Sequence, residues 1–175
     1  MSNLEHDSRF LEAAFPELEA YLLAEALYWP LGGTLPRLTP GALLLALRQV
    51  EARSSPILAG KWRAQLETVR MRRRTAWEQK SLKELQNRLR LWSASVSEWQ
   101  SAQAERRADY PGEVRGRVIL QILLSEVNAP LERSALASLD ISLRNSLTLT
   151  AFLWSQDLQP AFPPEEFWFL YGKLD

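Results

Sequence analysis

The segment from Lys61 to Asp109 contains neither glycine nor proline, the two residues that most often interrupt a helix. In its second half, apolar residues recur at alternating spacings of three and four, which places them on one face of an α-helix. These residues are Leu82, Leu85, Leu89, Trp92, Val96 and Trp99. In aqueous solution an apolar face of this length must be buried against other parts of the protein. We therefore predict a long central helix.

The first half of this segment carries another apolar face, which is out of phase with the heptads. Leu66 and Leu82 are separated by 16 residues. At about 3.6 residues per turn, this separation is nearly half a turn out of register. Either one helix contacts two surfaces in turn, or the chain forms a helical hairpin near Lys80, where Ser81 and Glu84 have the spacing of a capping box. Because glycine and proline are absent, we favour the continuous helix.

Helical patterns also precede this segment. Apolar residues at spacings of three and four predict an amphipathic helix over residues 7–29, in which Pro16 marks either a kink or the helix start. Thr39–Pro40 and Ser55–Pro56 each combine a capping side chain with a proline that suits the first turn of a helix. The helix that begins at Pro40 is apolar on most sides, so we expect it inside the protein.

Two further helices are predicted after the long segment. Tyr110–Pro111 begins a helix whose apolar residues run from Val114 to Val127, and Pro130 begins another that continues through Leu143. Residues 146–160 show both period-two and helical spacing, and we interpret them as extended or irregular.

The tail, residues 160–171, is rich in aromatic side chains and predicts a short helix that begins at Pro163 or Pro164. We expect this tail to fold back onto the bundle, because a free segment this apolar would aggregate. A length of 175 residues fits one domain of ordinary size. The sequence therefore predicts an all-α, single-domain helical bundle over residues 1–175, with one long central helix or helical hairpin and a short aromatic C-terminal helix.

Composition argues against several kinds of chemistry. The chain has no cysteine, and His6 is its only histidine, so most zinc and iron ligand sets are excluded and we expect no metal and no cofactor. The loop Leu31–Thr34 lacks the glycine spacing and the lysine of a phosphate-binding loop. We identify no catalytic residues and do not favour an enzyme. Neither a signal peptide nor an apolar run that could span a membrane is apparent, so we expect a cytoplasmic location.

The formal net charge of zero conceals two oppositely charged regions. Residues 1–30 carry six acids and one base, whereas residues 61–90 carry ten bases and three acids. The basic region predicts a face formed by Arg63, Arg70, Arg73 and Arg74. This face either binds a nucleic acid or another polyanion, or is neutralised by acids of the protein itself. We favour neutralisation, because no nucleic-acid-binding motif accompanies the charge.

The apolar face from Leu82 to Trp99, here called the heptad stripe, is the basis of the favoured hypothesis for function. We predict a non-catalytic protein-interaction or scaffold module that self-associates as a coiled-coil homodimer. Its interaction residues would be Leu89, Trp92, Val96 and Trp99, since tryptophan is prominent in binding hot spots. We expect these residues to pack against another long helix, either the helix from Val114 to Val127 in the same chain or the equivalent helix of a second subunit. The alternatives are polyanion binding through residues 61–90, and a small-ligand or enzymatic pocket between the helices.

Overall fold

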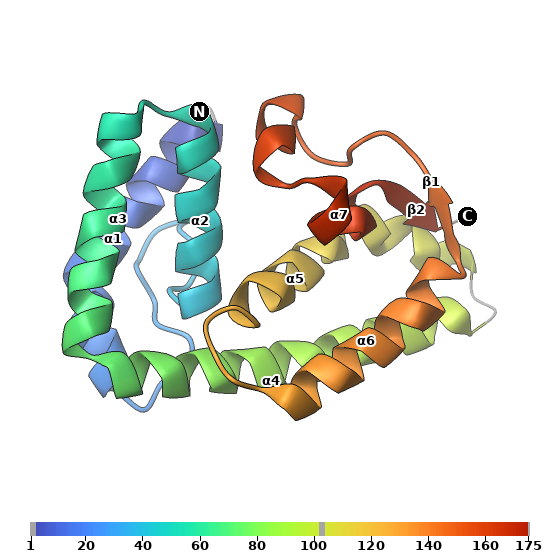
Figure 1. The fold of residues 1–175 in the computed structure, drawn as a ribbon, viewed down its shortest axis with the longest axis horizontal. Helices are drawn as coiled ribbons and strands as arrows, with labels where there is room; N and C mark the ends of the chain where they lie inside the picture. The colour runs from blue at the N-terminus through green and yellow to red at the C-terminus, as the bar shows by residue number, and fades with distance from the viewer. Residues whose placement is uncertain (1–2, 102–103, 175) are drawn as a thin grey trace. The chain divides into compact units, whose positions relative to one another are not determined.

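The computed structural model describes residues 3–101 and 104–174 of the chain (Figure 1). It is predominantly helical, which confirms the predicted all-α class. The α-helices are α1 (Asn3–Leu23), α2 (Pro40–Arg53), α3 (Pro56–Arg72), α4 (Arg74–Gln100), α5 (Tyr110–Leu123), α6 (Pro130–Arg144) and α7 (Pro164–Phe167). The 3₁₀ helices are η1 (Ala104–Asp109), η2 (Gln156–Ala161) and η3 (Trp168–Leu170), and the two strands are β1 (Leu147–Leu149) and β2 (Gly172–Leu174).

The chain divides into two compact units. Unit 1 is Met1–Glu84 and holds α1, α2, α3 and the first part of α4. Unit 2 is Leu85–Asp175 and holds the rest of α4 and all later elements. The single domain over residues 1–175 stays a prediction.

The predicted helix starts agree with the structure. The Thr39 hydroxyl accepts a hydrogen bond from the Ala42 amide at 3.0 Å, and α2 begins at Pro40. The Ser55 hydroxyl accepts from the Leu58 amide at 3.4 Å, and α3 begins at Pro56. Helices α5, α6 and α7 begin at Tyr110, Pro130 and Pro164, as their sequence signals predict. Ten of the fourteen residues of α2 are buried, so this helix lies inside unit 1.

The continuous helix predicted for residues 61–109 is wrong. The chain breaks at Arg73, whose backbone leaves the helical region with φ −123° and ψ 35°. Figure 1 shows α3 meeting the first part of α4 at a corner. The break lets the two apolar faces, which are out of phase, contact different surfaces. The alternative hypothesis placed a turn near Lys80, whereas the break lies seven residues earlier, at Arg73. Helix α4 ends at Gln100, and residues 102–103 of the segment lie outside the described residues.

The first helix is shorter than residues 7–29 at its C-terminal end. Helix α1 runs through Pro16, so it does not begin there, and it ends at Leu23. The next carbonyls turn toward α4 instead of continuing the helix: the ammonium of Lys80 donates to Ala24 O at 2.6 Å and also to Ala26 O. This single cation therefore holds the segment that follows α1 against α4.

In unit 2 the aromatic tail folds back onto α5, as predicted. Phe162, Phe167 and Phe169 are fully buried, and the Tyr110 hydroxyl of α5 donates to Phe169 O at 2.7 Å. The last residues form β2, which pairs antiparallel with β1 in the register Leu147↔Leu174. The helix predicted to reach Val127 ends earlier, because hydrogen bonds from Ser125 and Glu126 to carbonyls three residues back tighten its last turn.

A buried carboxylate on α4 holds the N-terminus of α2. Glu84 is fully buried, and its Oε2 accepts from the Gly41 amide at 2.7 Å while its Oε1 accepts from the Thr39 hydroxyl at 2.6 Å. Because α2 is buried, its first amides cannot bond to water and need partners from the protein. The negative charge also complements the positive end of the helix dipole. Glu84 thus caps a different helix from the one that contains it.

We expect Glu84→Ala to lower the free energy of unfolding by about 3 kcal/mol, because hydrogen bonds to a charged group are lost and a buried amide is left without a partner. Urea unfolding followed by circular dichroism measures this change. Glu78→Ala is the matched control on the same helix, since Glu78 makes a surface ion pair with Arg74 that we expect to contribute less than about 1 kcal/mol. Equal losses in the two variants would contradict the capping role.

Candidate functional site

Most of the predicted interaction stripe is buried within unit 2. Trp92, Val96 and Trp99 are 3%, 2% and 4% exposed, and Leu89 is half-buried. The ring centroids of Trp92 and Trp99 are 5.3 Å apart, and those of Trp99 and Tyr110 are also 5.3 Å apart, both edge to face. The stripe therefore packs against α5 of the same chain, and only Leu89 retains much exposed surface. A role for these four residues in binding a partner stays a prediction.

Leu89 lines a groove between α4 and α6. The groove has a volume of about 630 Å³, and its apolar residues include Leu89 and Leu139. Small residues of α6, among them Ala135 and Ser138, form part of one wall. The Gln86 amide donates to Glu132 at 2.7 Å and joins the two walls.

The outer face of α6 is apolar at both ends and small in the middle. Leu131 is 80% exposed and Ile141 is 66% exposed, and the exposed residues Ala135 and Ser138 lie between them. The opposite face of α6 is buried through Leu136. This helix therefore has one apolar face in the core and another in solvent, which sequence analysis did not single out, although Leu131, Ser138 and Ile141 follow the required spacing.

The predicted basic face is neutralised by carboxylates of unit 1. Arg63 of α3 makes two hydrogen bonds of 2.7 Å to Glu51 of α2. Arg73 lies 3.2 Å from Glu19 of α1, which also pairs with Arg72. The predicted pairing of the acidic first segment with the basic region therefore occurs at Glu19.

The other two predicted arginines pair within their own helices. Arg70 contacts Glu67 at 2.9 Å, and its guanidinium lies 5.6 Å from the Trp77 ring centroid. Arg74 contacts Glu78 at 2.9 Å. The charge of each of these arginines is thus partly offset by a carboxylate of the same unit.

Sequence reasoning missed a buried ion pair in unit 2. Arg117 of α5 is 2% exposed, and its Nε and Nη2 donate to the two carboxylate oxygens of Asp140 at 2.9 and 2.7 Å. Its Nη1 donates to Gln121, and its guanidinium lies 4.3 Å from the Phe169 ring centroid. Val114 and Val118 surround it on the helix, so an arginine on an otherwise apolar face was the available signal. Its donors face partners within the protein, and the pair joins α5, α6 and the tail.

Two buried groups have shifted pKa values. Burial raises the pKa of Tyr110 above its ordinary value, and the charge of Arg117 only partly offsets this effect. Burial, together with the neighbouring charge of Lys83, lowers the pKa of Lys80. Both groups hydrogen-bond to backbone carbonyls, so these shifts accompany structural roles.

Within residues 3–101 and 104–174, no cluster of three or more histidine, aspartate or glutamate side chains is placed to hold a metal ion. None of the helices in these ranges has the length and apolar character needed to cross a membrane.

No protein-family model, curated protein or solved structure matches this chain.

We expect Trp92→Ala to lower the free energy of unfolding by about 3–5 kcal/mol without changing the mass in solution, because the indole is buried against residues of its own chain. Denaturant unfolding and light scattering measure the two quantities. Leu91→Ala is the matched control, since Leu91 is the adjacent residue and is 51% exposed. A change of mass for Trp92→Ala, or equal stability losses in both variants, would contradict intrachain packing.

We expect stability to fall as the pH rises above about 10, because the raised pKa of Tyr110 means that the unfolded chain releases this proton before the folded chain does. Below that pH the contribution is fully present. Tyr110→Phe should reduce the alkaline loss, and the remainder should include Tyr171, whose pKa is also raised by burial. Urea unfolding from about pH 8 to about pH 11 compares the two proteins, and identical profiles would contradict this assignment.

Proposed function

We propose that the protein is a non-catalytic helical interaction module that forms a homodimer through the outer face of α6. The observation that carries this proposal is the exposure of Leu131 and Ile141 at the two ends of a face whose middle is small. Together with the small residues between them, these two aliphatic side chains form an apolar strip that pairing with a second helix would remove from water.

The spacing of these residues suits pairing with a second copy. Residues 131 and 141 are equally distant from position 136, so an antiparallel two-fold crossing there brings Leu131 of each copy next to Ile141 of the other. Ala135 and Ser138 would lie near the crossing point. Their small side chains allow the helix axes to approach to the lower end of the usual range, about 8 Å.

Charges beside this face also suit a two-fold interface. The groove next to α6 carries Arg90 on its α4 wall and Glu132 on its α6 wall. A two-fold axis that places one copy's α6 near the other copy's groove brings unlike charges together, which favours this orientation. Half-buried Leu89 and Leu139 offer apolar surface within the same groove. Leu89 would then belong to the interface, whereas Trp92, Val96 and Trp99 would support it from the core.

The test is the mass of the protein in solution. We expect Ser138→Arg to convert a dimer to a monomer, because a long charged side chain at the crossing point prevents close approach. Sedimentation velocity measures the mass across a range of concentrations, and circular dichroism checks that the variant is folded. Ser97→Arg is the matched control, since it makes the same change at an exposed site on α4. A wild-type monomer at every concentration, or dissociation by both variants, would overturn the proposal.

A further inference from the structure

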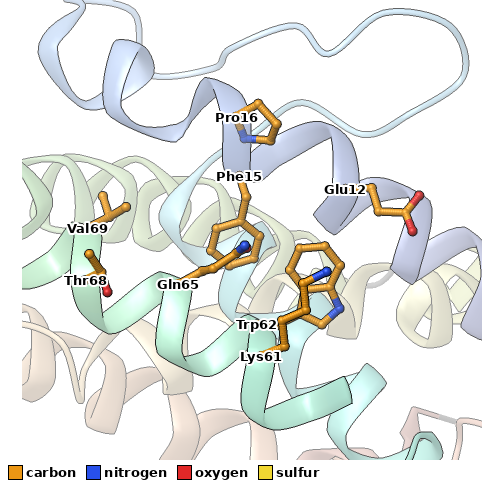
Figure 2. A pocket seen from close by; sticks show the side chains of 8 residues that line it. All are labelled: Glu12, Phe15, Pro16, Lys61, Trp62, Gln65, Thr68 and Val69. Carbon is orange, nitrogen blue, oxygen red and sulfur yellow. The ribbon is translucent and has the colours of Figure 1, made fainter. Parts of the chain in front are cut away.

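A hollow in unit 1 lies between α1 and α3 (Figure 2). Its volume is about 490 Å³, within the range of about 300–1,000 Å³ that small-molecule sites occupy. Phe15 and Pro16 of α1 and Trp62 and Val69 of α3 supply its apolar surface. Figure 2 shows Phe15 of α1 close to Gln65 and Trp62 of α3 in the view, whereas the Glu12 carboxylate extends away from them.

The hollow contains a buried donor that has no acceptor. Trp62 is 6% exposed, and its ring stacks on Phe15 with centroids 5.1 Å apart and planes 11° apart. Within the part of the chain that the structure describes, no group accepts a hydrogen bond from its indole Nε1. Buried tryptophan N–H groups usually have a partner, so this donor lacks the acceptor that such groups normally have. A ligand oxygen would satisfy it once the side chains that cover the N–H move aside.

A cation lies beside the same indole. The ammonium of Lys61 is 5.3 Å from the Trp62 ring centroid, and the side chain is exposed. Among residues 3–101 and 104–174, no carboxylate forms an ion pair with it. Nζ of Lys61 and Nε1 of Trp62 are therefore neighbouring donors, one charged and one neutral, at the edge of an aromatic surface.

We propose that this hollow binds a small aromatic monocarboxylate. The two oxygens of the carboxylate accept from Lys61 Nζ and Trp62 Nε1, and charge assistance makes the bond to the ammonium the stronger one. The flat apolar body of the ligand lies against Phe15, Pro16 and Val69. Lys61 is a flexible surface side chain, so it can move from the indole face to the carboxylate as the ligand enters.

One lining residue narrows the class of ligand. Glu12 of α1 also lines the hollow and carries a negative charge. A second negative charge on the ligand would be repelled by it, which favours a monocarboxylate over a phosphate or a dicarboxylate. This site lies in unit 1, whereas the proposed dimer face lies in unit 2, so each proposal can fail without the other.

The first experiment is a titration of ¹⁵N-labelled protein with 2-naphthoate, followed by NMR. Trp62→Phe identifies the Trp62 indole signal, since that signal alone should disappear from the indole region of the spectrum. We expect this signal to move downfield as the acceptor binds, with saturation at submillimolar to millimolar naphthoate. The neutral analogue 2-naphthylmethanol should bind at least about tenfold more weakly, since it lacks the charge. Equal binding of both probes, or an indole signal that does not move, would overturn the proposal.

The second experiment uses a pair of lysine variants. Lys61→Met should weaken naphthoate binding by at least about tenfold, because it removes the charged donor and keeps the aliphatic stem. Lys83→Met is the matched control, since Lys83 is exposed on α4 and does not line the hollow; its binding should stay within about twofold of wild type. Circular dichroism checks that both variants are folded. Unchanged affinity in Lys61→Met, or equal loss in both, would also overturn the proposal.

Discussion

The hydrogen bonds from the N-terminus of α2 to the carboxylate of Glu84 are the interaction on which the packing of unit 1 depends. A helix buried on nearly every side cannot leave its first amides to water, so its position requires an acceptor from another element. Glu84 supplies that acceptor together with the charge that the helix dipole favours. One turn earlier on α4, Lys80 binds the carbonyls that follow α1. A single turn of α4 thus fixes both ends of the connection between α1 and α2.

In unit 2 a buried positive charge likewise receives its hydrogen-bond partners from within the protein. Arg117 can be buried because Asp140, Gln121 and the ring of Phe169 receive its guanidinium. Removing one partner of such a pair leaves an uncompensated charge, which costs more than the intact pair contributes. The buried charged residues Glu84, Lys80 and Arg117 therefore each connect the helix that carries them to another segment of the same unit. The shifted pKa values of Lys80 and Tyr110 result mainly from burial of these side chains, and they do not by themselves indicate catalysis.

The two surfaces proposed for binding are largely apolar, and they differ in shape. The outer face of α6 has small residues between two large ones and lies beside the groove shared with α4, and such a face suits a second helix. The hollow between α1 and α3 is concave and has two donors beside stacked rings, which suits a small anion with a flat body. The two proposals therefore call for different ligands at different places in the chain.

Signals that act within a few residues were readable from the sequence. The helix starts at Pro40, Pro56 and Pro130 depend on a nearby capping residue or on proline, and the apolar periodicity determined that the fold is helical. The two out-of-phase faces indicated a change of packing surface, but the tertiary structure decided that the chain breaks at Arg73.

Ser81 and Glu84 have the spacing of a capping box, which would cap the start of their own helix. In the structure, however, the Glu84 carboxylate accepts from the Gly41 amide, 43 residues away in the chain. Likewise, the carbonyls that follow the end of α1 at Leu23 accept hydrogen bonds from a lysine more than fifty residues later in the chain. The sequence alone determined which backbone groups would need partners. Only the tertiary structure decided which side chains reach them, because hydrogen bonds and burial depend on distance in space and not on distance along the chain.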